Sequence, residues 1–398
     1  MLNREVRVIG QGYVGLPISL AAAACGYKVT GIDIDEHIVN NLNNGISHIS
    51  DISDVTLIGC INSGNYIASK SIVKMAKPAI NLICVPTPLD KSGLPDLGFV
   101  VSAIKMVAKT LIKGDLIIIE STIAPGTTRE LIVPMLETES GLSRHDFLVA
   151  FSPERIDPLS KIWNLRNTPK LVAGITLEAR SLASDFYSKF IELLEECDTV
   201  EIAETAKLLE NSFRLLNISF INEISIFCNV LGIDVLKVIK AASSKPYGFM
   251  PFYPSIGAGG HCIPVDPIYL TKKAKHIGSP VRLIEIADEI NTQMPEYFVS
   301  QAKDKLSSLA GKKILVIGVS YKPNISDTRQ TPVKALIDGL RNKGAQVSWH
   351  DDIVKEWEGE KSFALSGDFD LAIIATPHDY LDLTKLGNVP ILNTRGSI

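Results

Sequence analysis

Residues 6–25 read VRVIGQGYVGLPISLAAAAC, and this stretch decides the fold. The aliphatic run Val6–Ile9 is typical of a buried strand, and the small apolar residues of Leu16–Cys25 favour a helix. Between them lies the glycine-rich turn Gly10–Gly15. A strand that enters a helix through such a turn predicts the first unit of a doubly wound parallel sheet.

The glycine turn is suited to bind a pyrophosphate. Its glycines permit a tight turn and close approach of the backbone, and the N–H groups at the start of the helix attract an anion. A second predicted strand, Lys28–Ile32, ends at Asp33, close to the expected position of a ribose-binding acid. This acid, with no Arg directly after it, favours NAD over NADP; the alternative is a structural turn without a ligand. The predicted cofactor contacts here are Gly10, Gly12, Tyr13, Val14, Gly15 and Asp33.

Further strands are predicted between helical patterns at Ile80–Val85, Leu116–Glu120 and Phe147–Phe151. Strands that alternate with helices imply parallel pairing, and ligands then lie outside the carboxyl ends of the strands. Pro86 and Thr87 in VPTP and Thr122 in STIAPGTT follow two of these strands. We expect them to contact the cofactor; alternatively, they only shape turns.

Changes in the predicted secondary structure along the chain divide it into three predicted domains. Residues 1–198 form an NAD-binding Rossmann domain, residues 199–301 a helical connector, and residues 302–398 a second α/β domain. In the last domain, strands are predicted at Lys313–Val319, Gln346–His350 and Asp370–Thr376, with a helix at Thr331–Lys343. The fold class is therefore α/β, with two Rossmann-like doubly wound domains joined by helices.

Composition argues against several partners. The 398 residues carry a net charge of -4 without a Lys/Arg block, so nucleic acid is not an expected partner. No signal-peptide pattern precedes the first strand, and no apolar run approaches the roughly 18 residues that span a bilayer. The six cysteines are scattered without a CxxC pair, which favours reduced thiols and a cytoplasmic location without membrane insertion.

The connector contains two features that suggest chemistry. Lys207, Asn211, Arg214 and Asn222 share one stripe of a predicted helix; this stripe is either functional or a solvated face. The Pro- and Gly-rich stretch Lys245–Pro267 contains Cys262, whose neighbours are Gly, His and Asp, unlike the apolar surroundings of an inert thiol.

Two further side chains near these features have alternative interpretations. His261 lacks a Cys/His cluster around it, so no metal site is predicted. Glu154 follows the strand that ends at Phe151 and is either a general acid/base or one partner of a surface ion pair with Arg155.

Together these segments resemble the UDP-glucose/GDP-mannose dehydrogenase family over nearly the whole chain. The motifs that carry the resemblance are GQGYVGLP, VPTP, STIAPGTT, SPER, the Lys207–Asn222 helix, GAGGHCIPVDP and YKPNISDTR. The segment Phe249–Tyr269 is similar to the branch that oxidises UDP-N-acetylhexosamines, especially UDP-N-acetylglucosamine 6-dehydrogenases.

The resemblance implies a four-electron oxidation of the sugar C6 alcohol to a carboxylate, with two NAD molecules reduced. A water held by Thr122 and Asp266 would accept the hydroxyl proton in the first oxidation. Cys262 as thiolate would attack the resulting aldehyde, and the thiohemiacetal would be oxidised to a thioester.

The resemblance also assigns supporting roles. Lys207 and Asn211 would stabilise the oxyanion, and Glu154 would act as acid/base in thioester hydrolysis. Arg329 would reach toward the cofactor, and a homodimer or higher homo-oligomer would pair through the long connector helix. The implied contacts to the UDP-sugar are Glu154, Arg155, Lys207, Asn211, Arg214, Phe249, Phe252, Tyr253, Gly257, Gly259 and Lys322.

The expected substrate is UDP-N-acetylglucosamine, with UDP-N-acetylmannosamine, UDP-N-acetylgalactosamine and UDP-glucose as alternatives. Two other functions compete with this hypothesis. A two-electron hydroxy-acid dehydrogenase would use Lys and Asn on a connector helix without needing Cys262, and a nucleotide-sugar sensor would need no nucleophile at all.

Overall fold

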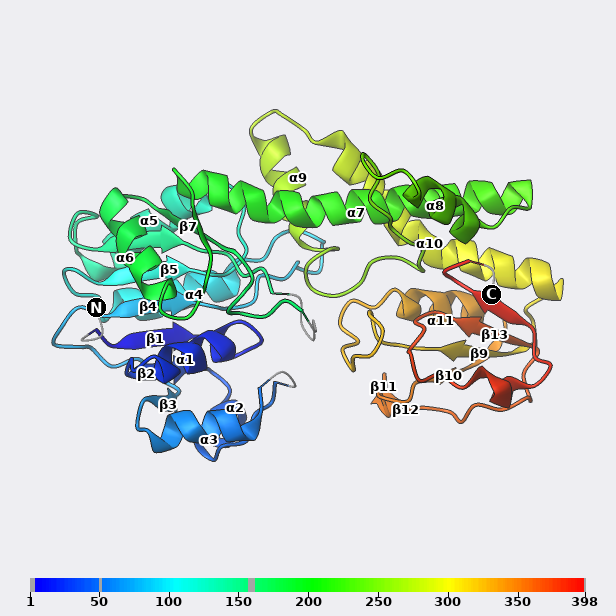
Figure 1. The fold of residues 1–398 in the computed structure, drawn as a ribbon, viewed down its shortest axis with the longest axis horizontal. Coiled ribbons are helices and arrows are strands. Elements are labelled where there is room, and N and C mark those ends of the chain that lie inside the picture. Colours follow the sequence, from blue (N-terminus) through cyan, green and yellow to red (C-terminus); the bar gives the residue numbers. More distant parts are fainter. Residues whose placement is uncertain (1–3, 50–51, 157–161, 397–398) are drawn as a thin grey trace. The chain divides into compact units, whose positions relative to one another are not determined.

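The computed structural model describes residues 4–49, 52–156 and 162–396. Contacts divide the chain into two compact units, Met1–Leu209 and Glu210–Ile398, and each is considered by itself. Figure 1 shows an α/β architecture with a long helix, α7 (Val200–Leu231), whose residues belong to both units. The division into three domains stays a prediction.

The first unit contains, within the described residues, an eight-stranded sheet of order β3-β2-β1-β4-β5-β6-β7-β8. The strands pair in parallel except β7, which is antiparallel to β6. Their bounds are β1 Val6–Ile9, β2 Val29–Ile32, β3 Tyr66–Ser69, β4 Ile80–Ile83, β5 Leu116–Ile119, β6 Leu148–Phe151, β7 Lys170–Gly174 and β8 Leu194–Glu196. The order reverses between β1 and β4, which is the switch point at which doubly wound sheets bind ligands.

Helices cover both faces of this sheet because alternate strand residues point to opposite sides. In β5, Leu116 and Ile118 join one core cluster and Ile117 and Ile119 the other. The first cluster is completed by α1, α2, α3 and α6, and the second by α4, α5 and the start of α7. The bounds are α1 Gly15–Ala24, α2 Glu36–Asn43, α3 Asp54–Asn62, α4 Gly98–Ala108, α5 Val133–Ser140 and α6 Leu177–Tyr187, with a π-helical turn at Thr128–Ile132 before α5.

The second unit combines helices with a parallel sheet of order β10-β9-β13-β14. Its core packs α10 and α11 on one sheet face, and residues around Leu386 fill the other. The bounds are α8 Val235–Ser243, α9 Asp266–His276, α10 Arg282–Leu306, β9 Lys313–Ile317, α11 Val333–Asn342, β10 Gln346–His350, β13 Leu371–Ile374 and β14 Ile391–Asn393, with a hairpin of β11 Glu356–Trp357 and β12 Glu360–Lys361 and a 3-10 turn at Leu383–Leu386.

These sheets confirm the predicted fold class of two doubly wound α/β regions. The predicted strands Val6–Ile9 and Gln346–His350 match β1 and β10, and the other predicted strands run one to two residues past one or both of their observed ends. At the carboxyl edge, for example, the predicted strands include Cys84 and Glu120, which are buried but follow the ends of β4 and β5.

Helix α7 is long and apolar enough, by length and composition, to cross a membrane, although sequence analysis expected no such segment. The most apolar 18-residue window of α7 has a mean hydropathy of 1.2, and 28% of that window is buried. Its buried side includes polar contacts to the protein, such as the hydrogen bond from Ser219 Oγ to the Ala287 carbonyl. Those contacts are typical of a helix packed on a globular unit.

The first turn of α7 is fixed to the sheet edge by the buried carboxylate of Glu204. This group accepts hydrogen bonds from the N–H groups of Gly126 (2.6 Å) and Thr128 (3.0 Å) and from the Thr128 hydroxyl (2.6 Å). Burial nevertheless raises the pKa of Glu204 from 4.5 to about 7, because desolvation outweighs the three hydrogen bonds. The motif STIAPGTT is thereby held at the start of the connector helix.

We predict that this carboxylate makes the stability of the first unit pH-dependent. Since the folded-state pKa is raised, the contribution of Glu204 is full below the unfolded pKa and is lost as the pH rises from 4.5 to about 7. Relative to Glu204→Gln, the free energy of unfolding of the wild type should fall by about 3 kcal/mol over this range. Thermal melting across this pH range measures the difference.

Glu201→Gln is the matched control, one turn earlier on α7. The hydrogen bond from Arg129 lowers the pKa of Glu201, so its contribution is present above the unfolded pKa and is lost as the pH falls. The control difference should therefore run in the opposite direction. Parallel pH profiles for wild type and Glu204→Gln would contradict the prediction.

Candidate active site

The glycine turn after β1 has the geometry of a dinucleotide site. Gly10 adopts a positive φ of 90°, and a Cβ there would lie 2.5 Å from the Cys84 carbonyl oxygen. A Cβ on Gly15 would lie 1.8 Å from the Gly10 carbonyl oxygen, so both glycines are required by packing. Apart from its chain neighbours, a Cβ on Gly12 would have no atom of the described residues within 4 Å. Protein packing therefore does not explain Gly12, whereas a pyrophosphate lying against the backbone does.

Asp33 supports the same turn from the end of β2. Its carboxylate accepts hydrogen bonds from the N–H groups of Gln11 (2.9 Å) and Asp35 (3.0 Å). A carboxylate offers about four acceptor positions, so positions remain for the hydroxyls of a ribose. This arrangement fits NAD, whose 2′-hydroxyl can donate to an acid that would repel a 2′-phosphate.

Gln11 is a site residue that sequence reasoning did not assign. It is fully buried, and its side-chain oxygen accepts hydrogen bonds from Ser19 (3.2 Å) and Tyr66 (2.9 Å). Its amide nitrogen donates to the Val8 carbonyl (2.9 Å). Hydrogen bonds through Gln11 thus fix the glycine turn to β1, α1 and β3. A polar residue inside a run of glycines was the available signal.

The other predicted cofactor residues of the first unit lie at the same carboxyl edge or in the glycine turn. Pro86 and Thr87 follow β4 and Thr122 follows β5, with Pro86 exposed and both threonines half-buried. The two strand ends are joined because Ser121 Oγ donates to the Val85 carbonyl (2.7 Å). Within the glycine turn, Tyr13 is exposed and Val14 packs partly on the core.

Lys207 lies beside the SPER motif, so one residue of the predicted polar stripe meets the predicted acid. The Lys207 ammonium is buried and donates to the Glu154 main-chain oxygen at 2.6 Å. Glu154 Oε1 accepts from the N–H groups of Arg155 and Ile156, both at 2.6 Å. Within the described residues, Glu154 Oε2 is buried without a hydrogen-bond partner. This oxygen is chemically able to accept a proton or bind a water.

A buried ion pair that the sequence did not reveal holds the SPER backbone. Lys170, on β7, pairs with Glu120 at 2.7 Å and also donates to the carbonyls of Ser152 (3.3 Å) and Pro153 (3.2 Å). The Tyr187 hydroxyl donates to the same Glu120 carboxylate. Burial raises the pKa of Glu120 to about 7 despite the lowering effect of Lys170. Three consecutive carbonyls, 152 to 154, are thus fixed by two ammonium groups.

In the second unit, Cys262 occupies the turn directly before α9. Of the six thiols it is the exposed one; Cys25 is half-buried and the other four are buried. The Cys262 carbonyl accepts from the N–H groups of Val265 (3.2 Å) and Asp266 (2.9 Å), which starts the helical winding. Proximity to a helix N-terminus favours a thiolate.

Asp266, the first residue of α9, is joined to Cys262 by its backbone hydrogen bond. Its buried carboxylate accepts a hydrogen bond from Asn211 Nδ2 at 2.6 Å. The structure therefore brings together three predicted catalytic residues of this unit: Cys262, Asp266 and Asn211. The other three, Lys207, Glu154 and Thr122, lie in the first unit, where Lys207 and Glu154 meet.

Two buried asparagines anchor the loop that leads to Cys262. Asn222 on α7 accepts from the Ser255 N–H (2.9 Å), and Asn291 on α10 accepts from the Ala258 N–H (2.6 Å). Lys207, Asn211 and Asn222 are all buried, so the solvated-face alternative is wrong for them, whereas Arg214 is exposed.

The glycines of the Cys loop pack against the segment Tyr321–Pro332. A Cβ on Gly259 would lie 2.8 Å from Tyr321 Cβ, and one on Gly260 would lie 2.9 Å from the Tyr321 ring. A Cβ on Gly257 would lie 3.1 Å from the Asn291 carbonyl oxygen. Close packing explains Gly257 and Gly259 without a ligand, which the sequence did not indicate.

The remaining predicted contacts are spread over loops of both units. Phe252 packs on the connector core and lies edge-on to Phe213 at 6.1 Å, whereas Phe249 and Tyr253 are exposed. Arg329 forms an ion pair with Asp327. Lys322 is half-buried after β9, and Arg155 donates to the Pro169 carbonyl in the first unit. Among the described residues, no group of three or more His, Cys, Asp or Glu side chains could hold a metal ion.

Comparison with known proteins assigns this arrangement to one family along most of the chain. Family models of the UDP-glucose/GDP-mannose dehydrogenase family match residues 4–191 (NAD binding domain), 201–293 (central domain) and 315–394 (UDP binding domain).

Relatives match nearly the full length. A UDP-N-acetyl-D-glucosamine 6-dehydrogenase of Pseudomonas aeruginosa is 35% identical over 95% of this chain and 91% of its own. A UDP-N-acetyl-D-mannosamine dehydrogenase of Pyrococcus horikoshii is 33% identical over 94% of this chain and 89% of its own. A solved structure of UDP-D-ManNAc dehydrogenase from Pyrococcus horikoshii aligns with a TM-score of 0.89 at 32% identity, covering 98% and 95% of the two chains. The chain belongs to the UDP-glucose/GDP-mannose dehydrogenase family and is an NAD-dependent UDP-sugar dehydrogenase.

Proposed function

We propose that this enzyme oxidises the C6 alcohol of UDP-N-acetylglucosamine to the carboxylate, giving UDP-N-acetylglucosaminuronate. The observation that carries the proposal is the setting of Cys262. The thiol is exposed, lies at the start of α9, and is followed by a buried Asp266 that Asn211 orients. A two-electron dehydrogenase or a sensor has no use for a nucleophile in this position.

Bound NAD supplies the hydride acceptor for each of the two oxidations. In the first, Asp266 and Thr122 hold the water that takes the hydroxyl proton as C6 becomes an aldehyde. The Cys262 thiolate then adds to the aldehyde carbon, and loss of a hydride from this thiohemiacetal gives a thioester. Water cleaves the C–S bond of the thioester, which releases the carboxylate and restores the thiolate.

Lys207, Asn211 and Glu154 serve the second half of the reaction. The Lys207 ammonium and the Asn211 amide stabilise the negative oxygen that forms at C6. Glu154 moves the proton of the hydrolytic water, for which its buried and unbonded Oε2 is suited. The Lys207 to Glu154 hydrogen bond supports a shared task for the two residues.

The identity of the sugar rests on the Phe249–Tyr269 segment and its likeness to the N-acetylhexosamine branch. Relatives named for UDP-N-acetyl-D-glucosamine and UDP-N-acetyl-D-mannosamine are 35% and 33% identical, so identity alone does not separate the two configurations. UDP-N-acetylgalactosamine and UDP-glucose remain alternatives. We further propose that Arg214, Lys322 and the exposed Phe249 and Tyr253 bind the nucleotide sugar, and that the enzyme works in the cytoplasm.

A panel of UDP-sugars tests the substrate proposal directly. We expect UDP-N-acetylglucosamine to give the highest kcat/KM, with two NADH formed for each sugar consumed, because both oxidations occur before product release. NADH absorbance and product mass measure both quantities in one assay. One NADH for each sugar would contradict the four-electron route, and a higher kcat/KM for another sugar would reassign the substrate.

Cys262→Ala tests the covalent step. This variant should form no carboxylate, with a fall of at least about 10³-fold in net turnover because the nucleophile is lost, while its Kd for NAD is unchanged. Cys25→Ala, which removes a half-buried thiol at the end of α1, is the matched control and should retain wild-type turnover. Full acid production by Cys262→Ala would refute the thioester route.

We also propose that the enzyme is a homodimer or higher homo-oligomer paired through α7. The outer side of α7 carries apolar residues at intervals of four or seven, the spacing of a helix-pairing stripe. The exposed members are Ile202, Leu209, Phe213, Phe220, Phe227 and Leu231. An apolar stripe of this length is costly to leave in water, and a second copy of the helix would cover it.

Phe220→Asp combined with Phe227→Asp should convert the assembly to monomers, because two charges would be buried in the paired stripe. Sedimentation velocity measures the mass. Val55→Asp, at an 80% exposed apolar residue of α3, is the control and should leave the mass unchanged. A monomeric wild type would defeat the proposal, and flotation of the wild type with lipid vesicles would assign the stripe to a membrane.

A further inference from the structure

The carboxyl edge of the second sheet contains a buried polar network that the catalytic proposal does not use. Its centre is Asp351, directly after β10, whose side chain is fully buried. The carboxylate accepts from the N–H groups of Val319 (2.9 Å), Ile353 (2.9 Å) and Val354 (3.0 Å). Burial acts to raise the pKa of Asp351, but hydrogen bonds, led by the one from His378, outweigh it and hold the pKa at about 2.

Asp351 occupies in the second sheet the position that Asp33 occupies in the first. Each follows the second strand of its unit and accepts the N–H group of the residue after a positive-φ glycine, Gly10 or Gly318. The two sites differ in how accessible the carboxylate is. Asp33 is half-exposed, whereas Asp351 is sealed by the His378 ring, whose Nε2 lies 3.0 Å from Asp351 Oδ2. The ribose-binding position of this sheet is therefore filled by the protein itself.

The partners of His378 fix its tautomer. Its Nδ1 lies 2.9 Å from the Asn324 backbone nitrogen, which can only donate, so Nδ1 must accept. The proton of the neutral ring is then on Nε2 and is donated to Asp351. The ring also stacks on Tyr380 at 5.3 Å. His378 thus transmits the fixed position of Asp351 to the backbone at Asn324.

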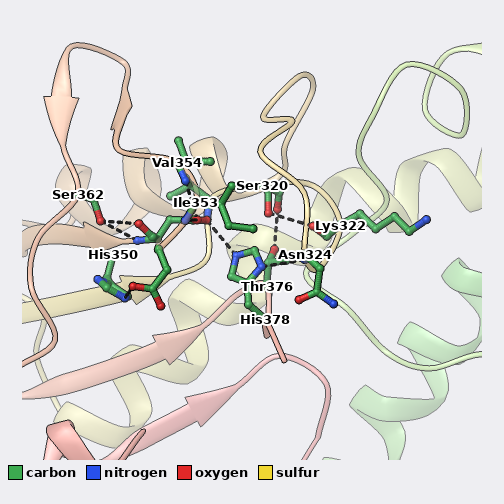
Figure 2. Close-up of polar contacts among 12 residues, drawn as sticks. Ser320, Lys322, Asn324, His350, Ile353, Val354, Ser362, Thr376 and His378 are labelled. Atoms are coloured by element: carbon green, nitrogen blue, oxygen red, sulfur yellow. Dashed lines mark hydrogen bonds and ion pairs between the residues drawn. The ribbon is translucent and has the colours of Figure 1, made fainter. Parts of the chain in front are cut away.

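Asn324 belongs to the short segment that carries Lys322. Three contacts fix this segment to the loop after β13: the His378 bond, the Thr376 hydroxyl bond to the Ser320 carbonyl (2.7 Å), and the paired bonds between Asn324 and Asp379 (2.8 and 3.0 Å). Asn324 has a φ of 66°, a left-handed conformation that asparagine adopts more readily than most other side-chain-bearing residues. Figure 2 shows the Lys322 side chain pointing away from His378, and the Lys322 carbonyl accepts a hydrogen bond from the Ser320 hydroxyl.

The geometry points to His378 as a positioning residue that presets Lys322 for the diphosphate of the UDP-sugar. The inference rests on the proposed role of Lys322 as a substrate cation. A lysine stem is flexible, so its affinity for a phosphate depends on how well its backbone is fixed before binding. Without the imidazole, the Asn324 N–H loses its acceptor and the turn that aims Lys322 loosens.

Two substitutions separate the two hydrogen bonds of the ring. In His378→Asn, the amide oxygen replaces Nδ1 as the acceptor for Asn324, whereas in His378→Gln the amide nitrogen replaces Nε2 as the donor to Asp351. We expect His378→Gln to raise the Kd for UDP and the KM for the UDP-sugar about tenfold, the effect of losing one hydrogen bond. His378→Asn should stay within about twofold of wild type, and kcat should change little in either variant. Equal effects of both variants on KM would overturn the proposal.

Lys322→Ala provides the decisive background. If His378 acts through Lys322, adding His378→Gln to Lys322→Ala should change the Kd for UDP by less than about twofold, because the interaction that His378 supports is already gone. Fully additive effects would overturn the proposal. His350→Gln is the matched control, since it removes a buried imidazole bond to the Phe363 carbonyl without contacting the Lys322 segment, and its Kd for UDP should equal that of wild type.

Hydrogen exchange of the Asn324 amide tests the role of His378 in the folded protein without relying on an activity assay. In the wild type, the backbone amide hydrogen of Asn324 should exchange slowly with solvent. The exchange rate should be higher in His378→Gln and unchanged in His378→Asn. Fast exchange in the wild type would overturn the proposal. A wild type that neither binds UDP nor oxidises UDP-sugars would instead refute the proposed function, with the exchange pattern still deciding whether His378 fixes the segment.

Discussion

One constraint recurs in both sheets of this enzyme. In each, a positive-φ glycine follows the first strand, and the N–H group of the residue after that glycine needs a hydrogen-bond acceptor. A carboxylate at the end of the neighbouring strand meets this need, Asp33 in the first sheet and Asp351 in the second. The acid fixes the turn that faces any ligand at the switch point. Whether a ligand then binds at the acid depends on what else surrounds it, and His378 makes that difference in the second sheet.

Buried polar side chains follow one another along α7. Glu204, Lys207 and Asn211 lie at intervals of three and four residues, and each is buried with a hydrogen-bond partner outside α7. A helix can present polar groups in this way only if its packing face is partly polar, which moves apolar residues such as Leu209 and Phe220 to the outside. The chemistry of α7 and its exposed apolar stripe therefore have a common origin.

The sequence predicted much of this because local patterns carry the information. The glycine turn, the period of the strands and the Pro/Gly-rich loop predicted the two sheets and the exposed thiol at Cys262. Three of the four residues in the polar stripe on α7, Lys207, Asn211 and Asn222, are buried, although polar stripes usually face solvent.

Other features required long-range pairing that no local pattern encodes. Lys170 and Glu120 are fifty positions apart and each resembles an ordinary strand-end charge, yet together they fix the SPER backbone. The positions of Asp351, His378 and Asn324 in the sequence likewise do not indicate that these residues are in contact. Gly257 and Gly259 are predicted as ligand contacts because a glycine in the sequence looks the same whether a substrate or another part of the protein packs against it.

A substitution at Gly12 would affect cofactor binding without affecting the fold. A methyl group at this position would touch none of the described residues apart from its chain neighbours, so the fold would tolerate it, but it would project into the space that the pyrophosphate requires. Folding and catalysis are thus separable at a single carbon atom. A chain altered there would fold normally but lack activity, and assays of expression or stability would pass it as normal.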